Sequence, residues 1–312
     1  MTDRQAELVI GVDAGGTKTI ALLEELSVTT PILRRGQGQS GPGNLRSVGL
    51  NAATREISAA IHAAFTDANI HVAAVEGLCL SVAGAGRIQE QQQLQAWAET
   101  QNFARRVIVT TDAEPILAAA SPAGVGIALI SGTGSLAWGR NSAGQVQRVG
   151  GWGYLFGDEG SGYAIAIAAL RAVALAADGR APPTTLHDAF LTRLTVATPS
   201  ELIDRIYGTA LSRDQIAACA ELVFEAAKHD PVARQILQAA ADDLATMVTT
   251  LARRLNFAAG KFPLAIAGGV LIHQPSFRAD LTARIGLPPN SVVPVPCPAV
   301  GAVMIARRLV QS

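Results

Sequence analysis

The chain has 312 residues, of which 49% are hydrophobic and 16% are charged, and its 25 basic side chains balance its 25 acidic ones. Balanced charge removes the main electrostatic reason to expect nucleic acid or an acidic membrane surface as a partner. The sequence shows no strongly apolar run of about 20 residues and no signal-peptide core, so we expect a cytoplasmic protein without a membrane partner. The cysteines Cys79, Cys219 and Cys297 lie far apart, which leaves a disulfide framework or a cysteine-rich metal site unsupported.

Short apolar runs rich in Val, Ile and Leu alternate along the chain with segments of helical pattern. We expect strands at 8–12, 77–82, 106–110, 126–130, 264–267 and 291–295. We expect helices at 47–68, 88–101, 113–121, 160–178, 184–195, 213–229, 231–257, 275–286 and 298–310. The alternation predicts an α/β fold with helices packed on mixed or parallel sheets, and the nearly all-helical stretch 160–257 predicts a helical insertion in the second half.

Two stretches share the order apolar strand, Gly/Thr turn, apolar strand. They are LVIGVDAGGTKTIALL at 8–23 and GIALISGTGSLAWGR at 126–140, and the QVQRVGGWG that follows the second one indicates a further antiparallel strand. Two similar hairpins, each opening its own α/β layer, predict a duplicated two-domain architecture.

The first turn contains Asp13, Gly15, Gly16, Thr17 and Lys18. Consecutive small residues let several backbone N–H groups converge on one anion, and a neighbouring carboxylate can hold Mg²⁺ or its waters beside a phosphate. A Walker A loop is absent, and a strand rather than a helix follows the turn. A plain hairpin with a solvated acid at its bend remains the alternative.

The second turn, at 131–135, reads SGTGS and is open to the same two interpretations, a glycine-rich hairpin or a phosphate loop. Further on, Asp112 follows a buried strand and precedes Pro115. It is therefore either a helix N-cap or a carboxylate at the strand end where α/β proteins place ligands.

The stretch 150–162, GGWGYLFGDEGSG, is the densest feature of the chain. Asp158, Glu159 and Ser161 could simply cap the following helix. The many glycines around Trp152 favour a loop folded around a ligand, and an aromatic face beside carboxylates is typical of sugar binding. Gly268 and Gly269 follow a strand and indicate either close approach of a flat ring or ribose, or tight strand–helix packing.

Taken in this order, these segments resemble the sugar-kinase, Hsp70 and actin-like ATPase superfamily. They are most similar to the N-acetylglucosamine kinase group of the BadF/BadG/BcrA/BcrD-type ATPase family. The resemblance spans nearly the whole chain and rests on GVDAGGTKT (11–19), GPGN (41–44), TTDAE (110–114), ISGTGS (130–135), GGWGYLFGDEGSG (150–162) and AGGV (267–270).

The resemblance implies two ribonuclease-H-like domains around an interdomain cleft for ATP and a sugar. The first would comprise 1–112 with the C-terminal segment 298–312, and the second 113–297 with the helical insertion. It matches Asp112 to the catalytic aspartate near the sugar 6-hydroxyl and Asp13 to the Mg²⁺-side acid. It places Asn44, Asp112, Trp152 and Asp158 on the sugar side, and Gly15, Gly16, Thr17, Lys18, Gly132, Thr133, Gly134, Ser135, Gly268 and Gly269 on the ATP side.

The implied activity is Mg²⁺- and ATP-dependent phosphorylation of the 6-hydroxyl of N-acetylglucosamine, by a homodimer. Glucosamine, N-acetylmuramic acid and glucose remain alternative acceptors. An activator ATPase of acyl-CoA dehydratases is disfavoured because SVAGAGR (81–87) lacks the cysteine that such proteins use for a shared iron–sulfur cluster. A chaperone-like nucleotide module is disfavoured by the sugar-side loop and Asp112, and the repressor-and-kinase family by the missing Cys-rich zinc segment.

Overall fold

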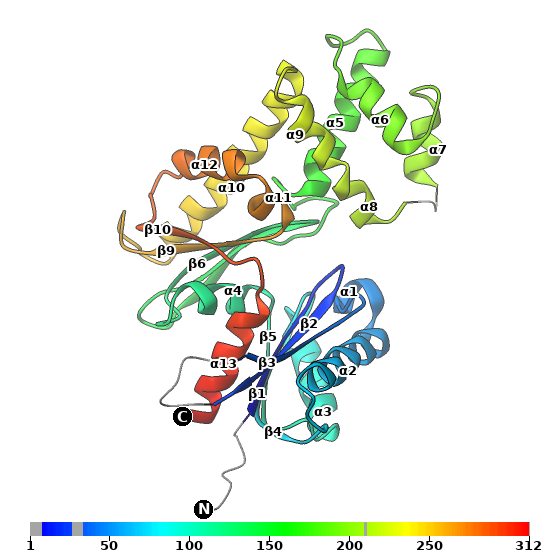
Figure 1. The fold of residues 1–312 in the computed structure, drawn as a ribbon. Helices are drawn as coiled ribbons and strands as arrows, with labels where there is room; N and C mark the ends of the chain where they lie inside the picture. Colours follow the sequence, from blue (N-terminus) through cyan, green and yellow to red (C-terminus); the bar gives the residue numbers. More distant parts are fainter. Residues whose placement is uncertain (1–7, 27–33, 209–210, 312) are drawn as a thin grey trace, which may run out of the picture. The chain divides into compact units, whose positions relative to one another are not determined.

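The computed structural model describes residues 8–26, 34–208 and 211–311. They form two compact units, which are described separately (Figure 1). Unit 1 is Met1–Gly124 with Cys297–Ser312, and unit 2 is Val125–Pro296. Each unit holds a five-stranded mixed sheet flanked by helices, so the predicted α/β class is confirmed.

The sheet of unit 1 has the strand order β3-β2-β1-β4-β5. Its antiparallel part joins β1 (Leu8–Ala14), β2 (Thr19–Glu25) and β3 (Arg34–Ser40), and its parallel part joins β1 to β4 (Val75–Val82) and then to β5 (Ala104–Thr110). The first hairpin predicted from the sequence is therefore confirmed, with Ala14 opposite Thr19 at its turn.

Helices cover both faces of this sheet, because side chains of successive strand residues point to opposite sides. Ile10 and Val12 pack in one core with α2 (Leu50–Asp67) and α3 (Ile88–Thr100), whereas Val9 packs in another with α13 (Ala299–Gln311). Figure 1 shows α13 on one side of the sheet and α2 and α3 on the other. The short helices α1 (Leu45–Val48) and α4 (Ala113–Ala120) complete unit 1.

The sheet of unit 2 has the order β10-β9-β6-β7-β8 and repeats the arrangement of unit 1. Three consecutive antiparallel strands, β6 (Gly126–Ser131), β7 (Ser135–Arg140) and β8 (Val146–Gly150), are followed on the other side of β6 by the parallel strands β9 (Pro263–Ala267) and β10 (Ser291–Pro294). The predicted second hairpin and the strand after it are confirmed, and the internal similarity in the sequence corresponds to a structural duplication.

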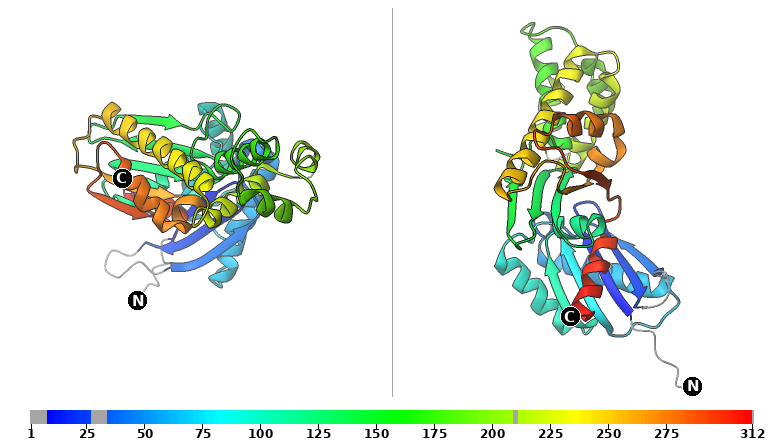
Figure 2. Two further views of the ribbon diagram at one scale, coloured as in Figure 1. Left: turned by 90° about the horizontal axis from the view of Figure 1, so that it is seen from above. Right: turned by 90° about the vertical axis from the view of Figure 1, so that its left-hand side faces the viewer.

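The predicted helical insertion is also present, between β8 and β9. It consists of α5 (Gly162–Ala177), α6 (Leu186–Leu194), α7 (Glu201–Tyr207), α8 (Arg213–Ala218), α9 (Ala220–Ala226) and α10 (Pro231–Arg254). The long helix α10 packs across β6, β7 and β8 (Figure 2). After β9, the chain forms α11 (Gly269–His273) and α12 (Pro275–Arg284).

The division between the units lies after Gly124, later than the boundary that we expected after Asp112. Helix α4 accounts for the difference, because it packs on α13 within unit 1. At Gly301 of α13, an added Cβ would lie 1.8 Å from the carbonyl oxygen of Pro115 in α4. Only a residue without a side chain allows the two helix backbones to lie this close.

Candidate active site

The parallel strands of unit 1 bring two carboxyl groups to the same edge of the sheet. Asp13 is the second-last residue of β1, and Asp112 follows the end of β5 by two residues. Burial, and then the negative charge of Asp112, raises the pKa of Asp13 to about 7, while Lys18 opposes the shift. Two interacting carboxyl groups at the carboxyl ends of parallel strands are the arrangement expected of a ligand site in an α/β fold.

Asp112 occupies the N-cap position of α4, but its side chain accepts no capping hydrogen bond from that helix. Burial raises the pKa of Asp112 to about 6, against the opposing effect of the backbone N–H groups of Asp112 and Ala113. Of the two interpretations that the sequence leaves open, this geometry favours a carboxylate held for a ligand over a structural cap.

The glycine turn between β1 and β2 is closed by a hydrogen bond from the Gly15 N–H to the Lys18 carbonyl, at 3.0 Å. Thr17 and Lys18 are exposed, so both side chains are accessible to a ligand within unit 1. Thr19, in contrast, is fully buried, and its hydroxyl donates to the Gly41 carbonyl at 2.9 Å. The hydroxyl of Thr19 therefore fixes the neighbouring loop and is not available to a phosphate.

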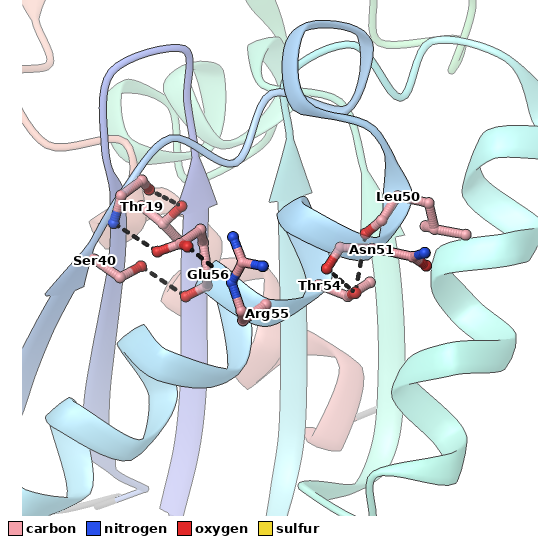
Figure 3. Close-up of polar contacts among 8 residues, drawn as sticks. Thr19, Ser40, Leu50, Asn51, Thr54, Arg55 and Glu56 are labelled. Carbon is pink, nitrogen blue, oxygen red and sulfur yellow. Dashed lines mark hydrogen bonds and ion pairs between the residues drawn. The ribbon is translucent and has the colours of Figure 1, made fainter.

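That neighbouring loop is GPGN, residues 41–44, and it packs directly on the glycine turn. The Gly43 N–H donates to the Gly15 carbonyl at 2.9 Å. From α2, Glu56 accepts the Gly41 N–H on Oε2 at 2.9 Å, and its carbonyl accepts the Ser40 hydroxyl at 2.6 Å (Figure 3). The loop is thus held on one side by the glycine turn and on the other by the side chain and carbonyl of Glu56.

Asn44 ends this loop and begins α1. Its Oδ1 accepts the Arg46 N–H at 3.0 Å, and the next residue, Leu45, donates its N–H to the Ala83 carbonyl at 2.9 Å. Within the described part of the chain, the two N–H bonds of the Asn44 side-chain amide have no partner, so they can donate to a ligand. The structure therefore brings Asp13, the glycine turn and Asn44 into one continuous group of loops in unit 1.

In unit 2, the second turn is enclosed by the glycine-rich segment 157–162. The Ser131 hydroxyl donates to the Gly160 carbonyl at 2.8 Å, and the Ser135 hydroxyl donates to the Glu159 carbonyl at 2.6 Å. The Gly162 N–H donates to the Gly132 carbonyl at 2.7 Å. These hydrogen bonds join the two glycine-rich segments, 131–135 and 157–162, so that they pack against each other.

Asp158 lies inside this structure with a left-handed backbone, at φ 60°. It is 5% exposed, and its Oδ1 accepts the Ser135 N–H at 3.3 Å. Burial raises its pKa, while the Ser135 N–H and the charge of Arg213 oppose that rise. Trp152, from the same loop, is 63% exposed and lies under the guanidinium of Arg148, 5.4 Å from the ring centre.

Gly268 brings the end of β9 against the second turn. Its φ is 91°, and an added Cβ would lie 2.2 Å from the Ser131 carbonyl oxygen. At Gly269, a Cβ would meet only the His273 ring, at 3.8 Å, so space is available there. Tight backbone packing thus explains Gly268, whereas Gly269 is exposed and would accommodate a Cβ.

Two residues of α8 reach the glycine-rich loops of unit 2, and the sequence did not indicate either of them as a site residue. Asp214 accepts the Thr133 hydroxyl on Oδ1 at 2.6 Å. Arg213 lies over the Tyr154 ring at 5.5 Å and acts electrostatically on Asp158. The only local signal was the capping box formed by Ser212 and Gln215, which marks the start of the helix without indicating what the helix contacts.

No group of three or more His, Cys, Asp or Glu side chains that could hold a metal ion occurs among residues 8–26, 34–208 and 211–311. Cys79 is buried in β4. Among the helices that the structure describes, none is both long and apolar enough to cross a membrane.

Known proteins similar to this chain span nearly its whole length. It is 32% identical over 305 residues to an N-acetylmuramic acid/N-acetylglucosamine kinase of Clostridium acetobutylicum, covering 96% of this chain and 98% of that protein. It is 28% identical over 316 residues to an N-acetyl-D-glucosamine kinase of Dictyostelium discoideum, with the same coverage of 96% and 98%.

Solved structures share the fold. A Chromobacterium violaceum protein assigned as an N-acetylglucosamine kinase superposes with a TM-score of 0.77 at 24% identity, covering 98% of this chain and 99% of that one. A ROK-family glucokinase of Streptomyces griseus superposes with a TM-score of 0.53 at 19% identity, covering 96% and 99%. The model of the BadF/BadG/BcrA/BcrD ATPase family matches residues 10–306, and the chain belongs to that family.

Proposed function

We propose that the protein is an ATP-dependent kinase that transfers a phosphoryl group to the 6-hydroxyl of N-acetylglucosamine. The observation that carries this proposal is Asp112, a half-buried carboxyl group without an N-cap hydrogen bond at the carboxyl edge of parallel strands, close enough to Asp13 to shift its pKa. The names of the two full-length relatives support an amino-sugar acceptor. We further propose that the protein is cytoplasmic and forms a homodimer. Light scattering would test the homodimer by measuring its mass in solution.

In this mechanism, Asp112 accepts the proton of the 6-hydroxyl while the hydroxyl oxygen forms a bond to the γ-phosphorus. The bond from that phosphorus to the bridging oxygen breaks, and ADP leaves. Phosphoryl transfer depends on positioning and charge stabilisation more than on covalent catalysis. A positioned general base typically contributes about 10²–10⁴ in rate.

The other site residues take roles that their surroundings permit. In unit 1, the Asn44 amide donates to a sugar hydroxyl, and Gly15, Gly16, Thr17 and Lys18 bind phosphate oxygens. In unit 2, Asp158 accepts from a sugar hydroxyl, and Trp152 offers the apolar face that sugars pack against. The turn residues Gly132, Thr133, Gly134 and Ser135 bind phosphate, and Gly268 and Gly269 border the nucleoside.

The carboxyl groups of Asp13 and Asp112 fit Mg²⁺, because their shifted pKa values indicate a place where a cation would relieve burial and mutual repulsion. Mg²⁺ in kinases is typically held by one or two carboxylates together with substrate phosphates, so a cluster of three acids is unnecessary. Asp13 would hold the ion or its waters, and the ion when bound would neutralise the charge of the phosphates.

N-acetylmuramic acid is the second candidate acceptor, and Arg46 is the observation that favours it. Arg46 follows Asn44 by two residues; its side chain is 55% exposed, and its only ion pair within the described residues is a loose one, Nε to Glu90 Oε1 at 3.8 Å. The lactyl carboxylate of N-acetylmuramic acid would find a cation there, whereas N-acetylglucosamine has no group that needs one.

The test is ADP release from Mg·ATP with N-acetylglucosamine, N-acetylmuramic acid, glucosamine, N-acetylmannosamine and glucose. We expect N-acetylglucosamine to stimulate ADP release most. The Asp112→Asn variant should bind ATP nearly as the wild type does and lose about 10²–10⁴ in turnover. Asp188→Asn, at an exposed acid of α6, is the matched control. Absence of stimulation by any sugar, or full activity of Asp112→Asn, would contradict the proposal.

A further inference from the structure

The second turn of unit 2 is connected to α8 by one short hydrogen bond. The Thr133 hydroxyl donates to Asp214 Oδ1 at 2.6 Å. A hydroxyl–carboxylate bond of this length is charge-assisted and stronger than a bond between neutral groups. Thr133 is half-buried in the turn, and Asp214 is exposed in the first turn of α8.

Helix α8 holds this carboxylate in a fixed position. Its start is secured by a capping box, in which the Gln215 N–H donates to the Ser212 hydroxyl at 3.2 Å and the Ser212 N–H donates to Gln215 Oε1 at 2.8 Å. Ile216 and Ala217 on the same helix are buried. The capping box and the buried side chains of α8 therefore hold Asp214 in place beside Thr133.

A hydroxyl group has one hydrogen to donate. While Thr133 donates to Asp214, it cannot donate to a phosphate oxygen. A phosphate oxygen that takes over this hydrogen bond would also stand no more than about 5.4 Å from the Asp214 Oδ1 atom if that atom stays in place, because each oxygen would lie about 2.7 Å from the same hydroxyl oxygen. Two negative charges at that separation repel each other.

The neighbouring cation, Arg213, contacts other residues of unit 2. Arg213 lies over the Tyr154 ring, 5.5 Å from its centre, and its charge acts on Asp158. Thr133 thus faces a carboxylate that would repel a nucleotide phosphate.

We propose that Asp214 is an affinity-determining residue for the nucleotide. In the nucleotide-free protein, its carboxylate accepts the hydrogen bond of the Thr133 hydroxyl. A nucleotide phosphate has to displace the carboxylate from this hydrogen bond and is repelled by its negative charge, so Asp214 weakens the binding of ADP and ATP. The inference rests on the proposed function, specifically on the role of Thr133 in binding phosphate. Its consequence for turnover is faster release of ADP, a step that limits many kinases and related enzymes.

The experiment is calorimetric titration of ADP, with and without Mg²⁺, into the wild type and Asp214→Asn. Asparagine keeps the size of the side chain and an acceptor oxygen but removes the charge. We expect the Kd for ADP to fall about three- to tenfold, and the difference to shrink as ionic strength rises. Asp188→Asn, which changes the net charge of unit 2 equally, should leave the Kd unchanged.

A second pair of variants separates the hydrogen bond from the charge. In a Thr133→Val background, the gain from Asp214→Asn should become smaller, because the hydroxyl for which both groups compete is gone. Asp214→Ala should also tighten ADP binding, which guards against an effect peculiar to asparagine.

An unchanged or higher Kd in Asp214→Asn would overturn this inference and leave the proposed function intact, provided that the wild type binds ADP and phosphorylates a sugar. A wild-type protein that neither binds ADP nor phosphorylates any sugar would overturn the proposed function, and the role of Asp214 with it.

Discussion

The carboxyl group of Asp112 combines two properties that are rarely found together at the start of a helix. Burial raises its pKa to about 6 although the backbone N–H groups of Asp112 and Ala113 act against that rise, and it forms no N-cap hydrogen bond with α4. An acid in this position is a stronger base than a solvated aspartate, because burial disfavours its charged form. Two predictions follow from this balance.

The first concerns the pH dependence of the proposed reaction. A general base must be ionised, so activity should be retained above the raised pKa and lost as the pH falls through about 6. Because kcat/KM reports on the free enzyme, its acid limb for N-acetylglucosamine should lie between about 6 and about 7, the raised pKa values of Asp112 and Asp13. Measurement from pH 5 to pH 8.5 checks this, and a profile that stays flat down to pH 5 would contradict it.

The second concerns stability. A carboxyl group whose pKa is raised in the folded state destabilises the fold wherever it is ionised, so the cost is full above about pH 6 and vanishes towards pH 4. Asp112→Asn removes this cost. We expect its Tm to exceed that of the wild type by about 2–4 °C at pH 8, the shift that about 1 kcal/mol causes in such domains.

The advantage of Asp112→Asn should shrink as the pH is lowered from 6 towards 4, and thermal melts at both ends of this range measure it. A variant less stable than the wild type at pH 8 would show that the Asp112 carboxylate holds the fold together instead.

Some of these residue positions could be predicted from the sequence and others could not. Asp13 and Asp112 follow from the rule that parallel strands end at one edge of a sheet. The contacts of Asp158 with Ser135 and of Asp214 with Thr133 join residues 23 and 81 positions apart, through loops and helices whose packing the local sequence does not encode. For that reason, Asp214 could not be recognised before the structure was known.

At the scale of elements, the one strand among the described residues that the sequence did not predict has no apolar pattern. The segment RRGQGQS forms β3, although it lacks hydrophobic alternation. Its glycines explain this, because an added Cβ would lie 2.2 Å from the Ala64 carbonyl oxygen at Gly36 and 1.9 Å from that of Ala60 at Gly38. The strand is stabilised by the close approach of α2 rather than by side chains of its own.

The same kind of contact allows a prediction about α4 and α13. A Gly301→Ala substitution would place a methyl group 1.8 Å from the Pro115 carbonyl oxygen, so the start of α4, which directly follows Asp112, has to move. We expect a loss of about 1–3 kcal/mol in unfolding free energy, typical of overpacking, together with reduced turnover.

Gly86→Ala is the control for this prediction, since nothing lies within 4 Å of a Cβ at that position. Denaturant unfolding and sugar-dependent ADP release measure both effects. Equal stability of the Gly301→Ala variant and the wild type would show that the two helices can separate without cost.

At the scale of the whole molecule, the duplication was visible in the sequence because both hairpins keep the same strand–turn–strand order. What the repeat did not reveal is that α4 belongs to unit 1, since its packing partner α13 comes from the far end of the chain. Unit 1 is therefore built from both ends of the sequence, whereas unit 2 is continuous.

A chain ending at Pro296 tests this division. Without α13, the core that contains Val9, Leu22 and Cys79 loses its cover, so we expect amide hydrogens of β1 and β4 to lose protection from exchange. Strands β6 and β9 of unit 2 belong to a separate core, so their amide hydrogens should stay protected from exchange. Full protection of β1 and β4 in the shortened chain would show that α13 is dispensable for unit 1.

The position of α13 at the end of the chain also affects how the protein folds while it is being synthesised at the ribosome. Domains generally fold as units while the chain is being made, with the N-terminal one first. Here all the strands and helices of unit 2 have been made before the residues that close the second face of the sheet in unit 1. Unit 2 can complete its fold first, and until α13 has been made the five strands of unit 1 are present but one face of their sheet is uncovered.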